Sequence, residues 1–66
     1  MFEKNDTVKL NDSIDEGRAE RHENIFHGLK PNLNYTVQDC SDGHILIGNT
    51  WVDAYYFTKV GNFPVN

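Results

Sequence analysis

The sequence predicts one small, mainly β domain in which five short antiparallel strands bend into a barrel. The most apolar stretch of the chain, residues 35–60, is divided into strand-length pieces by an Asp-Gly pair at 42–43 and a Gly-Asn pair at 48–49. Such pairs supply the positive φ angles that tight hairpins need. Residues 7–10 alternate between polar and apolar side chains, which is typical of a strand with one buried face.

The strands share a single core, because a chain of 66 residues has room for only one. The predicted strands cover residues 7–10, 35–39, 44–47, 51–53 and 58–60. Ala54 and Phe57 lie three residues apart, which fits one turn of 3₁₀ helix beginning at Asp53. The predicted core is Val8, Leu10, Leu29, Tyr35, Val37, Ile45, Ile47, Val52, Phe57 and Val60. We expect the domain to span residues 1–60, with a flexible tail over residues 61–66.

A charged insert, residues 11–28, separates the first two strands, and two interpretations of it compete. It is either a long irregular loop or contains one or two helical turns between residues 18 and 26, capped by Asp12 or Ser13. Helical spacing would place an apolar set on one face: Ala19, His22, Ile25, Phe26 and Leu29. Against a helix, Glu16 and Glu20 are like charges four residues apart.

Composition favours a cytoplasmic protein. A lone cysteine, Cys40, cannot form a disulfide within the chain, and small secreted domains usually depend on several. The N-terminus has no signal-peptide pattern, and no apolar run has the length of a membrane span, so we expect no membrane contact. The net charge of −4 and the scattered Lys and Arg residues disfavour tight binding to nucleic-acid phosphates.

We expect neither a cofactor, nor a metal, nor catalytic residues. The candidate soft-metal ligands are His22, His27, His44 and Cys40. A zinc site needs three or four such side chains to converge on one ion. The five-residue spacing of His22 and His27 does not place them on one helical face. Cys40 and His44 flank a predicted turn, but no third group is identified that would orient them as a nucleophile and base.

Two sets of side chains are candidate binding residues. The insert carries the acidic set, Asp15, Glu16, Glu20 and Glu23, which could attract a basic partner or form a solvated surface with weak ion pairs. The aromatic set is Trp51, Tyr55 and Tyr56. A core of this size holds about two large rings, and we therefore expect at least one of the three side chains to be exposed. An exposed ring could serve as an interface anchor or as a platform on which bases stack. Alternatively, Trp51 covers the sheet beside Leu46 and the tyrosine hydroxyls reach water.

The order of these elements resembles a Src-homology-3-like (SH3-like) barrel: a strand, a long polar loop, three strands joined by hairpins, a 3₁₀ turn and a last strand. The ending WVDAYYFTKV carries the likeness, and the residues that match the closing pattern of such domains are Val52, Ala54, Tyr56, Phe57 and Val60. Polyproline-binding members have a tryptophan where this chain has His44 and a proline where it has Asp53. The resemblance therefore implies the fold, whereas the departures at His44 and Asp53 disfavour polyproline binding.

The segments GLKPNLNYTV and DGHILI are also similar to small barrel proteins encoded by bacteriophages, which implies a phage origin and a host cytoplasmic location. We expect a non-enzymatic protein-binding module, a phage-type accessory protein acting on a host or viral protein through the acidic insert and the aromatic set. One alternative is a nucleic-acid-binding barrel that uses the aromatic set with Lys30 and Lys59; another is a structural component of an assembly. The chain is expected to be a monomer or a weak dimer.

Overall fold

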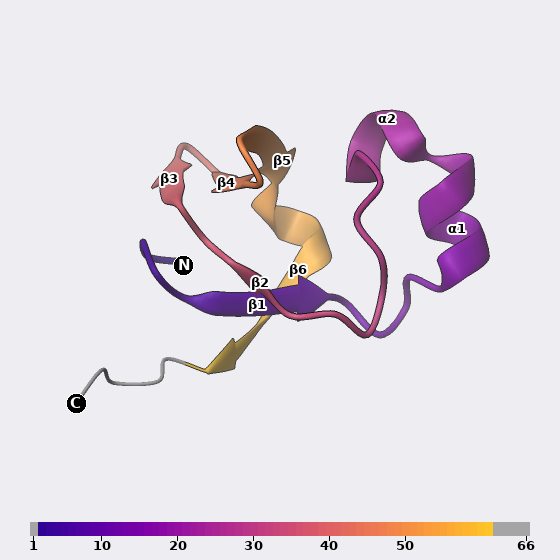
Figure 1. Ribbon diagram of the computed structural model, residues 1–66, viewed down its shortest axis with the longest axis horizontal. Helices are drawn as coiled ribbons and strands as arrows, with labels where there is room; N and C mark the ends of the chain where they lie inside the picture. Colours follow the sequence, from indigo (N-terminus) through magenta and orange to yellow (C-terminus); the bar gives the residue numbers. More distant parts are fainter. Residues whose placement is uncertain (1, 62–66) are drawn as a thin grey trace.

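Two three-stranded antiparallel sheets form the framework of the protein in a computed structural model that describes residues 2–61. Their strand orders are β2-β1-β6 and β3-β4-β5. The elements in chain order are β1 (Thr7–Leu10), α1 (Glu16–Arg21), α2 (Glu23–Phe26), β2 (Tyr35–Thr36), β3 (Asp39–Ser41), β4 (His44–Ile47), β5 (Thr50–Asp53), the 3₁₀ turn η1 (Ala54–Tyr56) and β6 (Phe57–Gly61). In Figure 1 the two helices lie together at one end of the molecule, and β3, β4 and β5 lie above β1 and β2.

The predicted mainly β architecture is confirmed, whereas the two sheets are not closed into a barrel. The predicted strand 35–39 is two strands, so the described residues contain six strands where five were expected. The Val37 amide donates to the Asp6 carbonyl at 2.9 Å, and the next amide, Gln38, donates to the Leu46 carbonyl at 2.8 Å. The chain therefore leaves one sheet and joins the other between these two residues. Gly61 is the last residue of β6, and the predicted tail beyond it lies outside the described residues.

Both predicted hairpin turns are confirmed. Asp42 and Gly43 have φ angles of 46° and 80°, and they connect strands in which Ser41 faces His44. Gly48 and Asn49, with φ angles of 55° and 64°, connect β4 to β5 in the same way. Two consecutive positive φ angles are the signature of the two-residue turn that matches the twist of paired strands.

The charged insert is helical, which decides between its two interpretations. Asp15 is the N-cap of α1, where the prediction had placed Asp12 or Ser13, and its carboxylate accepts a hydrogen bond from the Arg18 amide at 2.7 Å. Residue His22 ends α1 and begins α2, and α2 ends at His27 in the left-handed region. Gly28, where φ is 80°, follows directly.

The core is built from both sheets and from the insert. Its buried members are Val8, Leu10, Ile14, Ala19, Phe26, Val37, Ile45, Ile47, Val52 and Phe57, with the predicted Leu29 and Tyr35 partly buried against them. The prediction of Val60 as a core residue is wrong, since it is 40 % exposed. The register between β1 and β6 pairs Val8 with Lys59 and then Thr7 with Gly61, so Val60 falls at a bulge opposite no residue of β1.

One core position is occupied by a carboxylate. Asp6 continues the buried alternation of Val8 and Leu10, and it is fully buried. Its Oδ2 accepts a hydrogen bond from the Glu3 amide at 2.8 Å, and its Oδ1 has no hydrogen-bond partner. The ammonium of Lys59 lies 3.6 Å from that Oδ1 and supplies the opposite charge.

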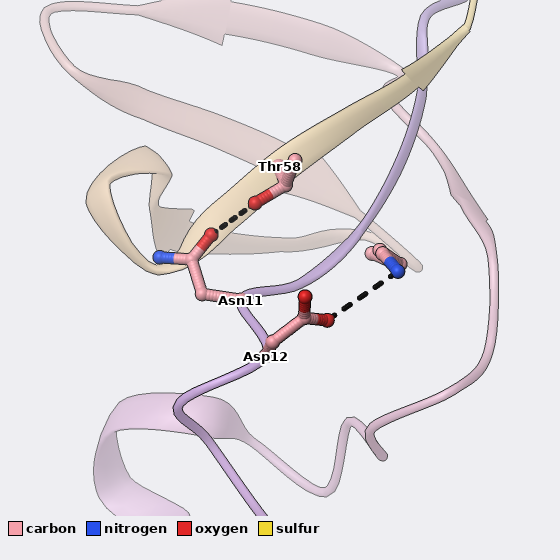
Figure 2. Close-up of polar contacts among 4 residues, drawn as sticks. Asn11, Asp12 and Thr58 are labelled. Atoms are coloured by element: carbon pink, nitrogen blue, oxygen red, sulfur yellow. Dashed lines mark hydrogen bonds and ion pairs between the residues drawn. The ribbon is translucent and has the colours of Figure 1, made fainter.

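Asn11 holds the start of the insert against the last third of the chain. Its amide donates to the Tyr56 carbonyl at 2.9 Å, and its side-chain Nδ2 donates to the Tyr55 carbonyl at 3.0 Å. Figure 2 shows its side-chain oxygen accepting from the Thr58 hydroxyl on β6, and Asp12 in an ion pair. The cation of that pair is Lys9, at 3.4 Å. These bonds fix the position from which the chain enters α1.

The predicted 3₁₀ turn is also confirmed. Asp53 caps it, because its carboxylate accepts a hydrogen bond from the Tyr55 amide at 3.0 Å. The turn reverses the chain so that Phe57 pairs with Leu10 at the end of β1.

Candidate functional site

The acidic set lines two adjoining grooves between the helices and the segment 28–33. The larger groove, of about 420 Å³, is lined by Leu10, Asn11, Asp12, Ile14, Asp15, Glu16, Lys30, Pro31, Asn32 and Leu33. The smaller groove, of about 230 Å³, is lined by Glu16, Ala19, Glu20, Glu23, Gly28, Leu29, Lys30 and Pro31. Because Glu16, Lys30 and Pro31 border both grooves, the two lie next to each other, and we call them together the acidic groove.

The acidic groove has apolar side chains along its length. Ile14 and Ala19 are buried, and Leu29 and Pro31 are half-buried. Leu33, at the outer end, is 49 % exposed, which makes it one of the large exposed apolar side chains of the described residues. A partner that covered Leu29, Pro31 and Leu33 would remove apolar surface from water, which is the main favourable term in most protein association.

The rim of the acidic groove is an unneutralised row of carboxylates. Of the residues that the structure describes, none forms an ion pair with Glu16, Glu20 or Glu23. The cation lining the groove is Lys30, whereas Arg18 and Arg21 border neither part of it. A surface with this charge balance attracts cations and repels anions.

Helical geometry explains why these carboxylates gather. Within α1, Glu16, Ala19 and Glu20 follow the three- and four-residue spacing that brings side chains to one helical face, and Glu23 begins α2 after the break at His22. A like-charge pair four residues apart destabilises a helix by about 0.2–0.5 kcal/mol. The helices form nevertheless, because burial of Ala19 and Phe26 in the core outweighs that repulsion.

The aromatic set is not one surface. Trp51 is 46 % exposed on β5 opposite Leu46, and Tyr55 is 79 % exposed on η1. Tyr56 is half-buried, with its ring centroid 5.2 Å from that of Phe26 and 5.3 Å from that of Tyr55. Tyr56 therefore connects α2 to the 3₁₀ turn, which leaves Trp51 and Tyr55 as the surface members of the set.

The two exposed aromatic side chains border different depressions. Tyr55 lines a groove of about 740 Å³ together with Phe2, Cys40, Ile45 and further residues of the β3–β4 hairpin. Trp51 lines a shallower one of about 410 Å³ with Ser41, Asp42 and His44. The hairpin turn around Asp42 borders both depressions and lies between the two rings.

Other candidate chemistry is sparse in the described part of the chain. Within residues 2–61, no group of three or more His, Cys, Asp or Glu side chains could hold a metal ion. Cys40 is exposed, and the His44 ring nitrogen Nδ1 lies 3.2 Å from the Asp42 carbonyl oxygen. No described helix has the length and apolar character needed to cross a membrane.

Comparisons with known proteins do not extend this description, because no family model, no curated protein and no solved structure matches the chain. The site is therefore defined by its geometry. Sequence reasoning identified the acidic side chains of the groove but missed its apolar residues, Ile14, Pro31 and Leu33. The available signal was a lone isoleucine within a run of polar residues, since an isolated large apolar side chain in such a run has to be covered by something.

Proposed function

We propose that this chain is a non-enzymatic protein-binding module that recognises a basic protein surface through the acidic groove. The observation that carries the proposal is that Asp15, Glu16, Glu20 and Glu23 line two adjoining grooves that also have apolar lining residues. Electrostatic complementarity of this kind steers association and selects partners of opposite charge, while apolar contact supplies affinity.

Exposed Trp51 and Tyr55 would add contacts at a second surface. Aromatic side chains of this kind are enriched among the residues that dominate binding energy at interfaces. Their exposure of 46 % and 79 % also supports the competing role, in which bases stack on them. The cations needed for that role are poorly placed, because Lys30 lies among carboxylates and Lys59 is paired with Asp6.

The proposal includes an SH3-like organisation of a single domain. It is supported by the passage of the chain from one sheet to the other at Val37 and Gln38, and by the 3₁₀ turn before the last strand. On the resemblance of its sequence, we assign the chain the role of a phage-type accessory protein in a bacterial host cytoplasm, acting on a host or viral protein. Assembly as a structural component is the remaining alternative.

The test is capture of proteins from a bacterial lysate on the immobilised full chain. The groove variant is Glu20→Gln/Glu23→Gln, and the matched control is Glu3→Gln/Asp39→Asn, which removes the same charge from exposed positions that line none of the grooves described. We expect the parent and the control to retain the same basic protein and the groove variant to lose it. Equal capture by the groove variant, or capture abolished by nuclease, would contradict the proposal.

A further inference from the structure

We infer that the acidic groove binds a short cationic peptide segment that carries one apolar side chain between its basic residues. This inference rests on the proposed function and specifies the part of the partner that is recognised. It follows from the number of carboxylates on the groove, from the size of its smaller part and from the charge of Lys30.

The groove offers more than one carboxylate to a cationic partner. Glu16 and Glu20 on α1 and Glu23 on α2 all border its smaller part. Successive residues of an extended peptide advance about 3.3 Å, so neighbouring basic residues can each approach a different carboxylate.

The smaller part of the groove has room for one side chain. Its volume of about 230 Å³ is below the roughly 300–1,000 Å³ of pockets that enclose whole small-molecule ligands. Its apolar lining consists of Ala19, Leu29 and Pro31, and the carboxylates of Glu20 and Glu23 border it. A leucine-sized side chain between two basic residues matches that combination of lining and rim.

Lys30 is a cation on the border of the groove. It lines both parts of the groove, and no described residue forms an ion pair with it. Its ammonium lowers the negative potential of the groove, so a cationic segment binds against its repulsion. Replacement of Lys30 by methionine keeps the apolar stem and removes the charge, which gives a variant expected to bind more tightly.

The experiment is a fluorescence-anisotropy titration of the full chain with a rhodamine-labelled, acetylated and amidated peptide of sequence Lys-Lys-Leu-Lys-Lys. We expect Glu20→Gln/Glu23→Gln to weaken binding on the order of tenfold, at about threefold for each exposed charge pair lost. Lys30→Met should tighten binding by about threefold, while Glu3→Gln/Asp39→Asn should match the parent. A peptide with serine in place of leucine should bind about tenfold more weakly, because it cannot bury the apolar side chain.

Equal binding by the groove variant and the parent, or equal binding of the leucine and serine peptides, would overturn the inference. Failure of the peptide to bind at all would also overturn it. If lysate capture still depended on Glu20 and Glu23 in that case, the proposed function would stand and the groove would recognise a folded basic surface instead. If capture did not depend on them, the proposed function itself would fail.

Discussion

Replacing Phe26 with alanine should remove a large part of the stability of this domain. The Phe26 ring is 2 % exposed, belongs to the core cluster and packs edge-on against Tyr56 at an interplanar angle of 72°. It is the buried side chain of α2, so the cavity would open where the insert meets the sheets. If the insert were a solvated loop, as the competing interpretation of the sequence held, the same substitution would change little.

The size of the effect follows from burial. Truncation of a buried phenylalanine costs about 3–5 kcal/mol, including the cavity left behind. A domain of 66 residues has a total stability of roughly 3–10 kcal/mol at about 0.05–0.15 kcal/mol per residue. Phe26→Ala should therefore leave the domain marginally folded or unfolded at room temperature, whereas Phe26→Leu should cost only about 1–1.5 kcal/mol.

Urea denaturation followed by Trp51 fluorescence and by far-ultraviolet circular dichroism measures both variants. The control is Val60→Ala, which truncates a side chain that is 40 % exposed and should cost less than about 1 kcal/mol. The reasoning would be refuted if Phe26→Ala unfolded at the same urea concentration as Val60→Ala, because the insert would then contribute no packing to the core.

Three further predictions concern single positions. Asp6→Ala should destabilise the domain by about 1–3 kcal/mol in urea denaturation, since it removes the acceptor of the Glu3 amide. Asp6→Asn should cost less, because its side-chain oxygen can keep that hydrogen bond. Equal losses of stability in the two variants would show that the hydrogen bond is unimportant. Gly43→Ala should cost about 1 kcal/mol or more because φ is 80° there, and an unchanged melting temperature would contradict the turn geometry. Glu20→Gln should raise the free energy of unfolding by about 0.2–0.5 kcal/mol by relieving repulsion from Glu16. A loss of stability would show that Glu20 makes a favourable contact in the free protein.

Local signals in the sequence were sufficient to predict the two hairpin turns that connect the strands of the β3-β4-β5 sheet. The turns at Asp42-Gly43 and Gly48-Asn49 need positive φ angles that few other residue pairs tolerate, so turn position and strand register follow from the same residues. The cap at Asp53 and the spacing of Ala54 and Phe57 likewise defined the 3₁₀ turn.

Features that depend on residues distant in sequence could not be predicted in this way. The alternation of residues 35–39 is that of one strand, and only the bonds of Val37 to Asp6 and of Gln38 to Leu46 reveal that it serves two sheets. Val60 repeats the apolar pattern of Phe57, yet the bulge in the β1–β6 pairing leaves it without a partner. Ile14 has no periodic neighbours at all, so its burial depends on where the insert folds back.

The same distinction applies to the candidate site. The acidic set could be identified because Asp15, Glu16, Glu20 and Glu23 are close in sequence. Its juxtaposition with Lys30, Pro31 and Leu33 could not, because it depends on the segment after Gly28 returning along α1. For the aromatic set, the sequence predicted an exposed member but not the burial of Tyr56 against Phe26.

The claim that the insert carries the binding surface is tested most directly by mapping backbone amide chemical shifts during titration with the Lys-Lys-Leu-Lys-Lys peptide. The account predicts that the largest changes occur between residues 15 and 31, at amides such as those of Ala19 and Leu29 along the acidic groove. Changes centred on Trp51 and Tyr55, or spread evenly over both sheets, would contradict it.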